Sequence, residues 1–214
     1  MAKKKLIIFP FNGNGLEALD CISFDSYDLV GFVDDNPLKK SEDYEIYTRE
    51  ILHTFKEFYV LAVPGSPTSF RKRKEIISSL GIASSRFITA THPNASIGRN
   101  VKIGTNCLIM AGVVLTSNAR IGNHVCILPN SVIHHESVVG DYTLIGSNVA
   151  VAGGTIIGSN CYIGSGTNII NGISIGDASL IGLGSNILTN VPDDAKMVGN
   201  PARNLNAQVN KVVL

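Results

Sequence analysis

Two histidines followed by a glutamate, at residues 134–136, are the side chains of this sequence best suited to proton transfer. An imidazole can bind and release a proton near neutral pH. A neighbouring carboxylate can accept a hydrogen bond from one ring nitrogen, which fixes the tautomer and leaves the other nitrogen as a base. The run His134-His135-Glu136 therefore predicts general acid–base chemistry at this point of the chain.

A metal site is the first alternative to a general base. A catalytic zinc ion needs three converging protein ligands and one open position. Only His124 lies near the histidine pair, ten residues before His134, so we expect no metal here. The other alternative is a surface corner that carries no function.

The segment that must position these residues is a hexapeptide repeat from Ile97 to Pro192. The first residue of the hexad is aliphatic sixteen times in succession: Ile97, Ile103, Ile109, Leu115, Ile121, Ile127, Ile133, Val139, Ile145, Val151, Ile157, Ile163, Ile169, Ile175, Ile181 and Ile187. Such a period is typical of a parallel β-helix, in which each hexad forms one short strand and one corner. Three hexads make one coil, so we expect the aliphatic residues to point inward and residue n to stack on residue n+18.

This stacking separates residues that the β-helix needs from residues that it does not. Small residues, asparagine and glycine suffice at the corners, so the imidazole of His135 and the carboxylate of Glu136 exceed the structural requirement. The next coil places Gly153 over His135 and Gly154 over Glu136. These two glycines leave a groove in which a thin ligand can lie against the backbone.

The first ninety residues have the pattern of a small α/β domain with a parallel sheet. A strand at residues 5–9 is followed by a glycine turn and a helix, and the next strand ends in Asp34 and Asp35. The turn fits the spacing G-x-G-x-x-G/A through Gly13, Gly15 and Ala18. This layout is typical of nucleotide binding, where glycines let phosphate approach the backbone and an acid accepts from a ribose hydroxyl. A tight turn without a ligand is the alternative.

Other elements of this domain are expected from shorter signals. We expect strands at residues 57–63 and 86–89, and a helix at 68–80 whose basic run 71–74 faces solvent. The domains are then 1–90 for the α/β unit, 91–192 for the β-helix and 193–214 for a C-terminal tail. Because the end of a stack of strands cannot remain bare, we expect the α/β domain to cover the first coil.

Composition excludes several classes of function. The net charge of +1 over 214 residues gives no electrostatic reason to expect nucleic acid or a membrane surface as a partner. No apolar run approaches the roughly 18 residues that span a bilayer. The four cysteines form no Cys-x-x-Cys pair, and Cys107 and Cys161 fall on inward positions. We therefore expect buried, reduced thiols and a cytoplasmic protein.

Together these motifs resemble the bacterial sugar acyltransferases of the left-handed β-helix class, in the branch of sialic-acid O-acetyltransferases and nucleotide-aminosugar N-acetyltransferases. The resemblance covers nearly the whole chain. Its segments are Asn12-Gly-Asn-Gly15, Val30-Gly-Phe-Val-Asp-Asp35, Leu61-Ala-Val-Pro-Gly65, Phe70-Arg-Lys-Arg, His92-Pro-Asn-Ala-Ser-Ile97, His135-Glu136, Val139-Gly-Asp-Tyr142, Val151-Ala-Gly153 and Val198-Gly-Asn-Pro-Ala-Arg203.

The resemblance implies a Rossmann-like domain followed by a left-handed β-helix, assembled as a homotrimer with acetyl-CoA between two prisms. It implies that His135 is the general base, that Glu136 orients it, and that the Gly153 N–H lies near the thioester carbonyl. The pantetheine path would include Gly164, Ser165, Gly182 and Leu183, with Pro201 near the adenine. The nucleotide contacts would be Asn12, Gly13, Gly15, Asp34 and Asp35.

Three segments depart from this family. Its members often carry a second histidine nine residues after the catalytic one, where this chain has Leu144. Many also have an Asn-Thr pair shortly before the catalytic histidine, where this chain reads Leu128-Pro-Asn-Ser131, and a Gly-Gly-His-Gly or Ser-Gly-His-Gly turn where this chain has Asn12-Gly-Asn-Gly15. We expect an acetyl-CoA-dependent N-acetyltransferase that acts on a nucleotide-linked amino sugar. The alternatives are O-acetylation of a sialic acid or another hydroxyl acceptor, and a trimeric sugar-nucleotide-binding scaffold without catalysis.

Overall fold

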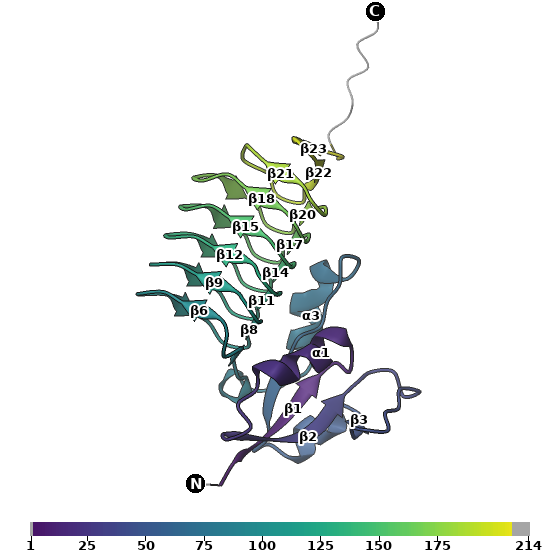
Figure 1. The fold of residues 1–214 in the computed structure, drawn as a ribbon. Helices are drawn as coiled ribbons and strands as arrows, with labels where there is room; N and C mark the ends of the chain where they lie inside the picture. The colour runs from purple at the N-terminus through teal and green to yellow at the C-terminus, as the bar shows by residue number, and fades with distance from the viewer. Residues whose placement is uncertain (1, 207–214) are drawn as a thin grey trace, which may run out of the picture.

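The computed structural model describes residues 2–206, which form an α/β domain beside a long prism of stacked coils (Figure 1). The α/β domain contains a four-stranded parallel sheet in the order β3-β2-β1-β4. Its strands are β1 (Lys4–Phe9), β2 (Tyr27–Val33), β3 (Ile46–Tyr47) and β4 (Tyr59–Ala62). The predicted parallel α/β unit is therefore present.

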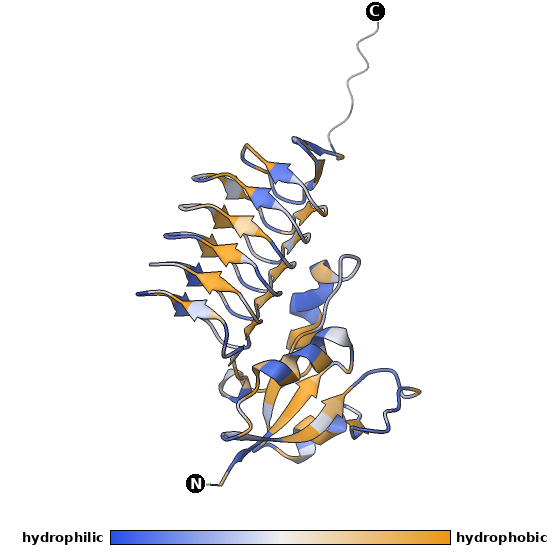
Figure 2. Ribbon diagram, viewed as in Figure 1, coloured by the Kyte–Doolittle hydropathy of each residue, from blue (hydrophilic) through white to orange (hydrophobic). Residues whose placement is uncertain are grey.

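Short helices cover both faces of this sheet. They are α1 (Gly13–Glu17), η1 (Ala18–Cys21), α2 (Glu50–Thr54), η2 (Phe70–Lys72), α3 (Arg73–Ser78) and η3 (Ser84–Arg86). The alternation of β1 sends Leu6 and Ile8 to one hydrophobic core and Ile7 and Phe9 to another, which α2 and α3 complete. Figure 2 shows β1 and most of β2 as hydrophobic.

Two local predictions in this domain are wrong. The expected strand at 86–89 is a 3-10 turn at Ser84–Arg86 followed by a single bridge between Phe87 and Val60. The basic run 71–74 does not face solvent throughout, because Arg73 is completely buried. Arg73 follows Phe70 by three residues and precedes Ile77 by four, so it shares the apolar side of the helix with these two buried residues.

The repeat forms a parallel β-helix, as predicted. Within residues 2–206, sixteen two-residue strands follow one another from β6 to β21, each ending on an aliphatic hexad position. The strands are β5 (Ala90–Thr91), β6 (Ser96–Ile97), β7 (Lys102–Ile103), β8 (Leu108–Ile109), β9 (Val114–Leu115), β10 (Arg120–Ile121), β11 (Cys126–Ile127), β12 (Val132–Ile133), β13 (Val138–Val139), β14 (Leu144–Ile145), β15 (Ala150–Val151), β16 (Ile156–Ile157), β17 (Tyr162–Ile163), β18 (Asn168–Ile169), β19 (Ser174–Ile175), β20 (Leu180–Ile181), β21 (Asn186–Ile187), β22 (Lys196–Gly199) and β23 (Ala202–Asn204). The hexads and their parallel stacking fit the left-handed form of this fold.

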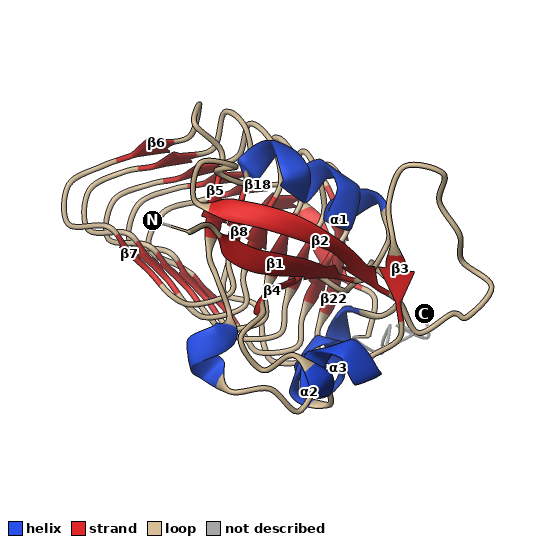
Figure 3. Cartoon of the chain, turned by 90° about the horizontal axis from the view of Figure 1, so that it is seen from below, coloured by secondary structure: helices blue, strands red, loops and turns tan. Residues whose placement is uncertain are grey.

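Three sheets form the faces of the prism. Face I is the five-stranded sheet of β7, β10, β13, β16 and β19. Face II is the eight-stranded sheet that runs from β5 through β8, β11, β14, β17 and β20 to β22 and β23. Face III is the six-stranded sheet of β6, β9, β12, β15, β18 and β21. Figure 3, seen from below, shows these rows of strands as stacked layers.

The corners between the faces are named here by one residue each. The His135 corner joins face III to face I, the Tyr142 corner joins face I to face II, and the Gly164 corner joins face II to face III.

The predicted stacking of residue n on residue n+18 holds along most of the prism. Ile133, for example, pairs with Leu115 on one side and Val151 on the other. The last coil is two residues shorter, since Ile175 pairs with Val191. The antiparallel hairpin of β22 and β23 then extends face II. Part of the predicted C-terminal tail, 207–214, lies outside the described residues.

The α/β domain packs along face II instead of covering the first coil. Outward side chains of face II, including Leu108, Cys126 and Leu144, join the hydrophobic core of Leu6 and Ile8. The side-chain amide of Asn106 binds both the N–H and the carbonyl of Ala62, at 2.7 and 2.8 Å. Ile97 on the first coil is consequently 42% exposed, so the expectation that all sixteen aliphatic positions are buried fails there.

Within residues 2–206, no helix has the length and hydrophobicity that crossing a bilayer requires.

Candidate active site at the His135 corner

The predicted general base lies on an exposed edge of the prism. His135 and Glu136 occupy the turn between β12 and β13, and their side chains are 63% and 68% exposed. His134 precedes them and is exposed as well. The corner therefore presents two imidazoles and a carboxylate to solvent, where a substrate can reach them.

Glu136 has a backbone conformation that is unfavourable for a glutamate. Its φ is +60°, in the left-handed region. The equivalent corner residues in neighbouring coils are Asn100, Asn118, Gly154 and Gly172, which are the residue types that tolerate this region. A glutamate at this position costs about 1 kcal/mol relative to such residues. A carboxylate kept at that cost is a reasonable candidate for a functional group.

The contact between the two predicted catalytic residues is longer than a hydrogen bond. The distance from His135 Nδ1 to Glu136 Oε2 is 3.9 Å. Both side chains are exposed, so rotation about their side-chain bonds can shorten this distance without a backbone change. The orienting role of Glu136 stays a prediction.

Gly153 lies directly against the imidazole of His135. A Cβ atom at Gly153 would lie 2.5 Å from both Cε1 and Nε2 of that ring, which is closer than any real contact. The N–H of Gly154 donates to the His135 carbonyl at 2.9 Å, which holds the two corners together. Glycine at position 153 is therefore what allows the ring to occupy its place.

The backbone N–H of Gly153 is available as a donor. At the Tyr142 corner, the equivalent N–H of Ser159 donates to the Asp177 carboxylate of the next coil, at 2.7 Å. The next coil at the His135 corner carries Asn171 instead, and among the described residues the Gly153 N–H has no hydrogen-bond acceptor. An imidazole and a free N–H thus lie side by side on one edge.

The predicted cofactor residues lie on another edge of the same prism. Gly164 and Ser165 follow β17, and Gly182 and Leu183 follow β20, so all four are at the Gly164 corner. A Cβ at Gly164 would lie 2.7 Å from the Leu183 nitrogen, because the coils approach closely there. Leu183 is 73% exposed. Pro201 lies in the turn between β22 and β23 and is exposed.

The predicted nucleotide residues lie at the carboxyl ends of β1 and β2. Asn12 caps α1, with its Oδ1 accepting from the Gly15 N–H at 2.8 Å, while Gly13 is exposed in the turn. Asp34 is buried and accepts from the N–H groups of Phe11 and Asn36 and from Lys39 Nζ.

Asp35 forms two contacts with the Arg49 guanidinium, at 2.5 and 2.7 Å, and is about half exposed. The carboxylate of Asp34 is thus occupied by its own loop, whereas Asp35 remains accessible.

Within one chain the structure does not bring these three groups together. The α/β domain covers face II, and His135 lies at the corner between the other two faces. The two leucines that depart from the family pattern are also far from His135 in this arrangement. Leu128 and Leu144 line a cleft of about 250 Å³ between the α/β domain and the Gly164 corner, together with Asn14, Gly65 and Gly146.

Sequence reasoning missed a polar cluster at the Tyr142 corner. The Arg73 guanidinium donates to the carbonyls of Pro64, His124 and Tyr142. Burial lowers the pKa of Arg73 to about 10. The His124 ring stacks on Tyr142 with centroids 4.6 Å apart, and its Nδ1 lies 2.9 Å from Asn106 Nδ2. Burial, followed by the charge of Arg73, lowers the pKa of His124 to about 4.

A sequence signal for part of this cluster existed. Arg73 falls between Phe70 and Ile77 on the apolar stripe of its helix, which marks it as an inward-facing cation. His124 is a packed ring that stacks on Tyr142 and lies beside the Asn106 amide. Among residues 2–206, no group of three or more His, Cys, Asp or Glu side chains is placed to hold a metal ion.

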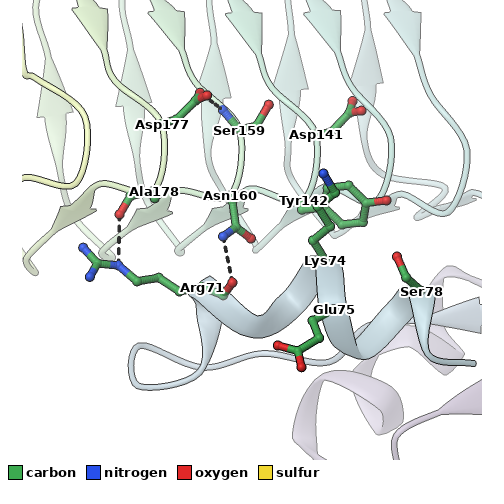
Figure 4. A pocket seen from close by; sticks show the side chains of 10 residues that line it. All are labelled: Arg71, Lys74, Glu75, Ser78, Asp141, Tyr142, Ser159, Asn160, Asp177 and Ala178. Carbon is green, nitrogen blue, oxygen red and sulfur yellow. Dashed lines mark hydrogen bonds between the residues drawn. The ribbon is translucent and has the colours of Figure 1, made fainter.

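A cleft of about 580 Å³ lies beside this cluster, between α3 and the Tyr142 corner (Figure 4). Arg71 spans it and donates to the Ala178 carbonyl at 3.2 Å, while Asn160 Nδ2 donates to the Arg71 carbonyl at 2.9 Å. Acidic and basic side chains are mixed along its walls, so its charge does not select one class of ligand. None of the residues predicted to bind or react lies in it.

Two family models match the repeat. The model described as bacterial transferase hexapeptide (six repeats) matches residues 118–153. The model described as hexapeptide repeat of succinyl-transferase matches residues 94–129, 138–170 and 154–189. The hexapeptide repeat of bacterial transferases is therefore present in this chain. No curated protein sequence matches the chain.

Solved structures share the whole fold. The acetyltransferase domain of PglB from Neisseria gonorrhoeae, in complex with acetyl coenzyme A, is 22% identical with a TM-score of 0.83, covering 95% of this chain and 100% of that one. A mutant of perosamine N-acetyltransferase from Caulobacter crescentus, in complex with CoA and GDP-perosamine, is 21% identical with a TM-score of 0.82, covering 95% and 97%.

WeeI from Acinetobacter baumannii is 22% identical with a TM-score of 0.80, covering 95% of this chain and 100% of that one. At this level of identity the likeness establishes the fold. The models confirm the predicted hexapeptide repeat, and these neighbours share the predicted fold of the β-helix class.

Proposed function

We propose that this hexapeptide-repeat protein transfers the acetyl group of acetyl-CoA to the amino group of a nucleotide-linked amino sugar. The observation that carries the proposal is the exposed imidazole of His135 packed against Gly153, whose N–H is free. A base and an N–H donor on one edge are the two groups that acyl transfer from a thioester needs. The neighbours in complex with acetyl coenzyme A, or with CoA and GDP-perosamine, support this donor and this class of acceptor.

The reaction we propose is direct transfer in a ternary complex. The amine nitrogen attacks the thioester carbonyl carbon while His135 accepts the proton that the amine loses. The negative charge that develops on the carbonyl oxygen is stabilised by the Gly153 N–H. The C–S bond then breaks and CoA leaves as the thiol or thiolate. No covalent enzyme intermediate is needed when the amine and the thioester are aligned.

We propose that the donor lies along the Gly164 corner, against Gly164, Ser165, Gly182 and Leu183, with its adenine near Pro201. Close approach of the coils at these glycines keeps that edge thin. The acceptor's nucleotide lies at the glycine turn of the α/β domain, near Asn12, Gly13, Gly15, Asp34 and Asp35. Of the two acids, Asp35 is the more exposed one, and its carboxylate can accept a hydrogen bond from the nucleotide beside its pair with Arg49, because Asp34 holds its own loop. The sheet order β3-β2-β1-β4 supports this assignment, since doubly wound nucleotide-binding sheets begin with the same order.

The complete site requires more than one copy of the chain. His135 lies on one edge of the prism, whereas the predicted donor residues lie at the Gly164 corner and the glycine turn lies beside that corner, where Asn14 lines a cleft with Gly146. A cyclic homotrimer, in which the His135 corner of one copy meets the Gly164 corner of the next, joins all three groups. Large exposed hydrophobic residues on both edges support this contact, with Ile170 and Leu188 above His135 and Leu183 at the Gly164 corner.

The proposal is tested by measuring thiol release from acetyl-CoA with a panel of UDP-, GDP- and dTDP-linked amino sugars, and with their hydroxyl analogues and free sialic acid. Turnover only with the amino sugars supports N-acetylation, and turnover only with hydroxyl acceptors identifies an O-acetyltransferase. The His135→Ala variant is expected to lose about 10²-fold or more in kcat. The matched control is His134→Ala, which removes the adjacent exposed imidazole and is expected to leave kcat within about threefold of wild type. Equal losses in both variants contradict the assignment of His135.

A further inference from the structure

Two cations lie next to each other on face I, on the N-terminal side of the His135 corner. Arg120 on β10 is in register with Lys102 on β7 and with Val138 on β13. Adjacent strands are about 4.8 Å apart, so the backbones of Arg120 and Lys102 lie about 5 and 10 Å from that of Val138. Val138 follows His135 by three residues, so the cations begin one strand away from the predicted base.

The fold gains nothing from this pair. Like charges in register on adjacent strands repel each other. Both side chains are exposed, and among the residues that the structure describes neither forms a salt bridge with a carboxylate. The outward residues at the same position on β16 and β19 are Ile156 and Ser174, which shows that face I does not need a charge there.

The cations share a cleft with the predicted catalytic carboxylate. This cleft has a volume of about 330 Å³ and is lined by Asn100, Lys102, Asn118, Arg120, Glu136 and Val138. The side chains of Asn100 and Asn118 are joined by a hydrogen bond of 3.3 Å. The cleft therefore combines two unpaired cations and two amides, and it opens at the corner where the proton is removed.

The position of the cleft indicates which substrate it serves. The residues proposed for acetyl-CoA all belong to later coils than His135 (Gly153, Gly164, Ser165, Gly182, Leu183 and Pro201). Lys102 and Arg120 belong to earlier coils. The donor and the cationic cleft are thus on opposite sides of the reacting centre along the prism axis.

We propose that Lys102 and Arg120 bind the diphosphate of the nucleotide-linked acceptor, and that they place its amino group at His135. This inference rests on the proposed function and adds an anion subsite to it. The sugar ring separates the amine from the diphosphate, so an anion held one or two strands from the corner leaves the amine at the corner itself. In the proposed trimer, face I continues from the His135 corner toward the α/β domain of the next copy, which holds the nucleotide.

The test measures binding of inorganic pyrophosphate, UDP, GDP and CoA to the full chain by titration calorimetry. The variants are Lys102→Gln and Arg120→Gln, with Arg120→Lys to retain the charge. The matched control is Lys196→Gln, an exposed lysine on β22 of face II. We expect each glutamine variant to weaken pyrophosphate and nucleoside diphosphate binding by about tenfold, or about 1.4 kcal/mol. CoA binding is expected to stay within about twofold of wild type, and Arg120→Lys to recover part of the loss.

Other outcomes overturn the inference. Loss of CoA binding with intact nucleotide binding assigns the cations to the donor's phosphates. Dissociation of the trimer by light scattering, with anion binding unchanged at matched trimer concentration, assigns them to the contact between copies. Unchanged binding of all four ligands removes the subsite.

Thermal unfolding and kinetics separate the subsite from structure and from the proposed function. Removing one of two repelling cations should leave the melting temperature unchanged or higher, whereas a structural role predicts a decrease. With an active acceptor, the KM for that acceptor should rise about tenfold with kcat little changed. If no amino sugar is turned over, the proposed function fails, and the pyrophosphate titration alone decides on the two cations.

Discussion

Replacement of Gly153 by alanine should inactivate the protein by moving one ring and not by unfolding the chain. The new Cβ would start 2.5 Å from two atoms of the His135 imidazole, and ordinary contact begins at 3.4 Å. The ring must therefore move by about 1 Å. A displacement of this size in a catalytic group costs on the order of 10²-fold in rate, which is about 2.7 kcal/mol of activation free energy.

The stability of this variant should not fall. Gly153 is not among the glycines whose φ is in the left-handed region, so alanine can adopt its backbone conformation. Alanine also reduces the conformational freedom of the unfolded chain, which stabilises by about 0.4–1 kcal/mol at such positions. We expect a melting temperature equal to or above that of wild type.

The assay compares kcat for Gly153→Ala, His135→Ala and the double variant. If Gly153 acts through the position of His135, the double variant should be no slower than His135→Ala alone, because the ring that alanine displaces is absent. Alanine keeps the backbone N–H, so the donor to the thioester oxygen is retained. The reasoning is refuted if Gly153→Ala keeps a wild-type kcat, or if the two losses multiply in the double variant.

Three further predictions concern stability. Burial and the charge of Arg73 lower the pKa of His124 to about 4 in the folded protein, whereas a histidine in the unfolded chain has a pKa of about 6.5. As the pH falls, the unfolded chain therefore binds this proton before the folded protein does. The free energy of unfolding should therefore fall as the pH drops from about 6.5 to 4, and His124→Asn should flatten this dependence in urea titrations. Arg73→Met leaves three carbonyls without their donor and should lower the free energy of unfolding by about 3 kcal/mol or more. The control Lys72→Met, on the exposed side of the helix, should change the free energy of unfolding by less than about 0.5 kcal/mol. Equal effects in the two variants contradict the role of Arg73. Glu136→Asn replaces a glutamate at φ +60° by a residue that tolerates this φ, so the folded protein should be more stable by about 1 kcal/mol. The same variant should have a kcat roughly tenfold lower. A variant that is more stable and keeps the wild-type kcat shows that Glu136 is not part of the site.

The β-helix was predictable from sequence because its register depends on local periodicity alone. Each aliphatic hexad residue points inward whatever lies outside the prism, so the period of six fixes the pairing of Ile133 with Leu115 and Val151. The same register predicts that Gly153 stacks over His135. The period could not predict the two-residue shortening of the last coil at Val191, since the hexad pattern ends there.

The α/β domain was predictable only in outline. The strands and the glycine turn follow from apolar runs and turn residues, but the burial of Arg73 depends on carbonyls that lie 51 and 69 residues away. Similarly, both carboxylates after β2 fit a nucleotide site by sequence. Their hydrogen bonds show that Asp34 holds its own loop and that Asp35 pairs with Arg49.

The sequence by itself determined which residues stack at each corner, and therefore that His135, Glu136 and Gly153 meet on one edge. Only the tertiary structure decided which face of the prism the α/β domain covers. That choice depends on side-chain packing between segments far apart in the chain, since Leu144 on face II joins the hydrophobic core of Leu6 on β1. Because the domain occupies face II, the predicted base and the predicted nucleotide turn are separated within one copy, and this separation is the physical reason to expect a site shared between copies.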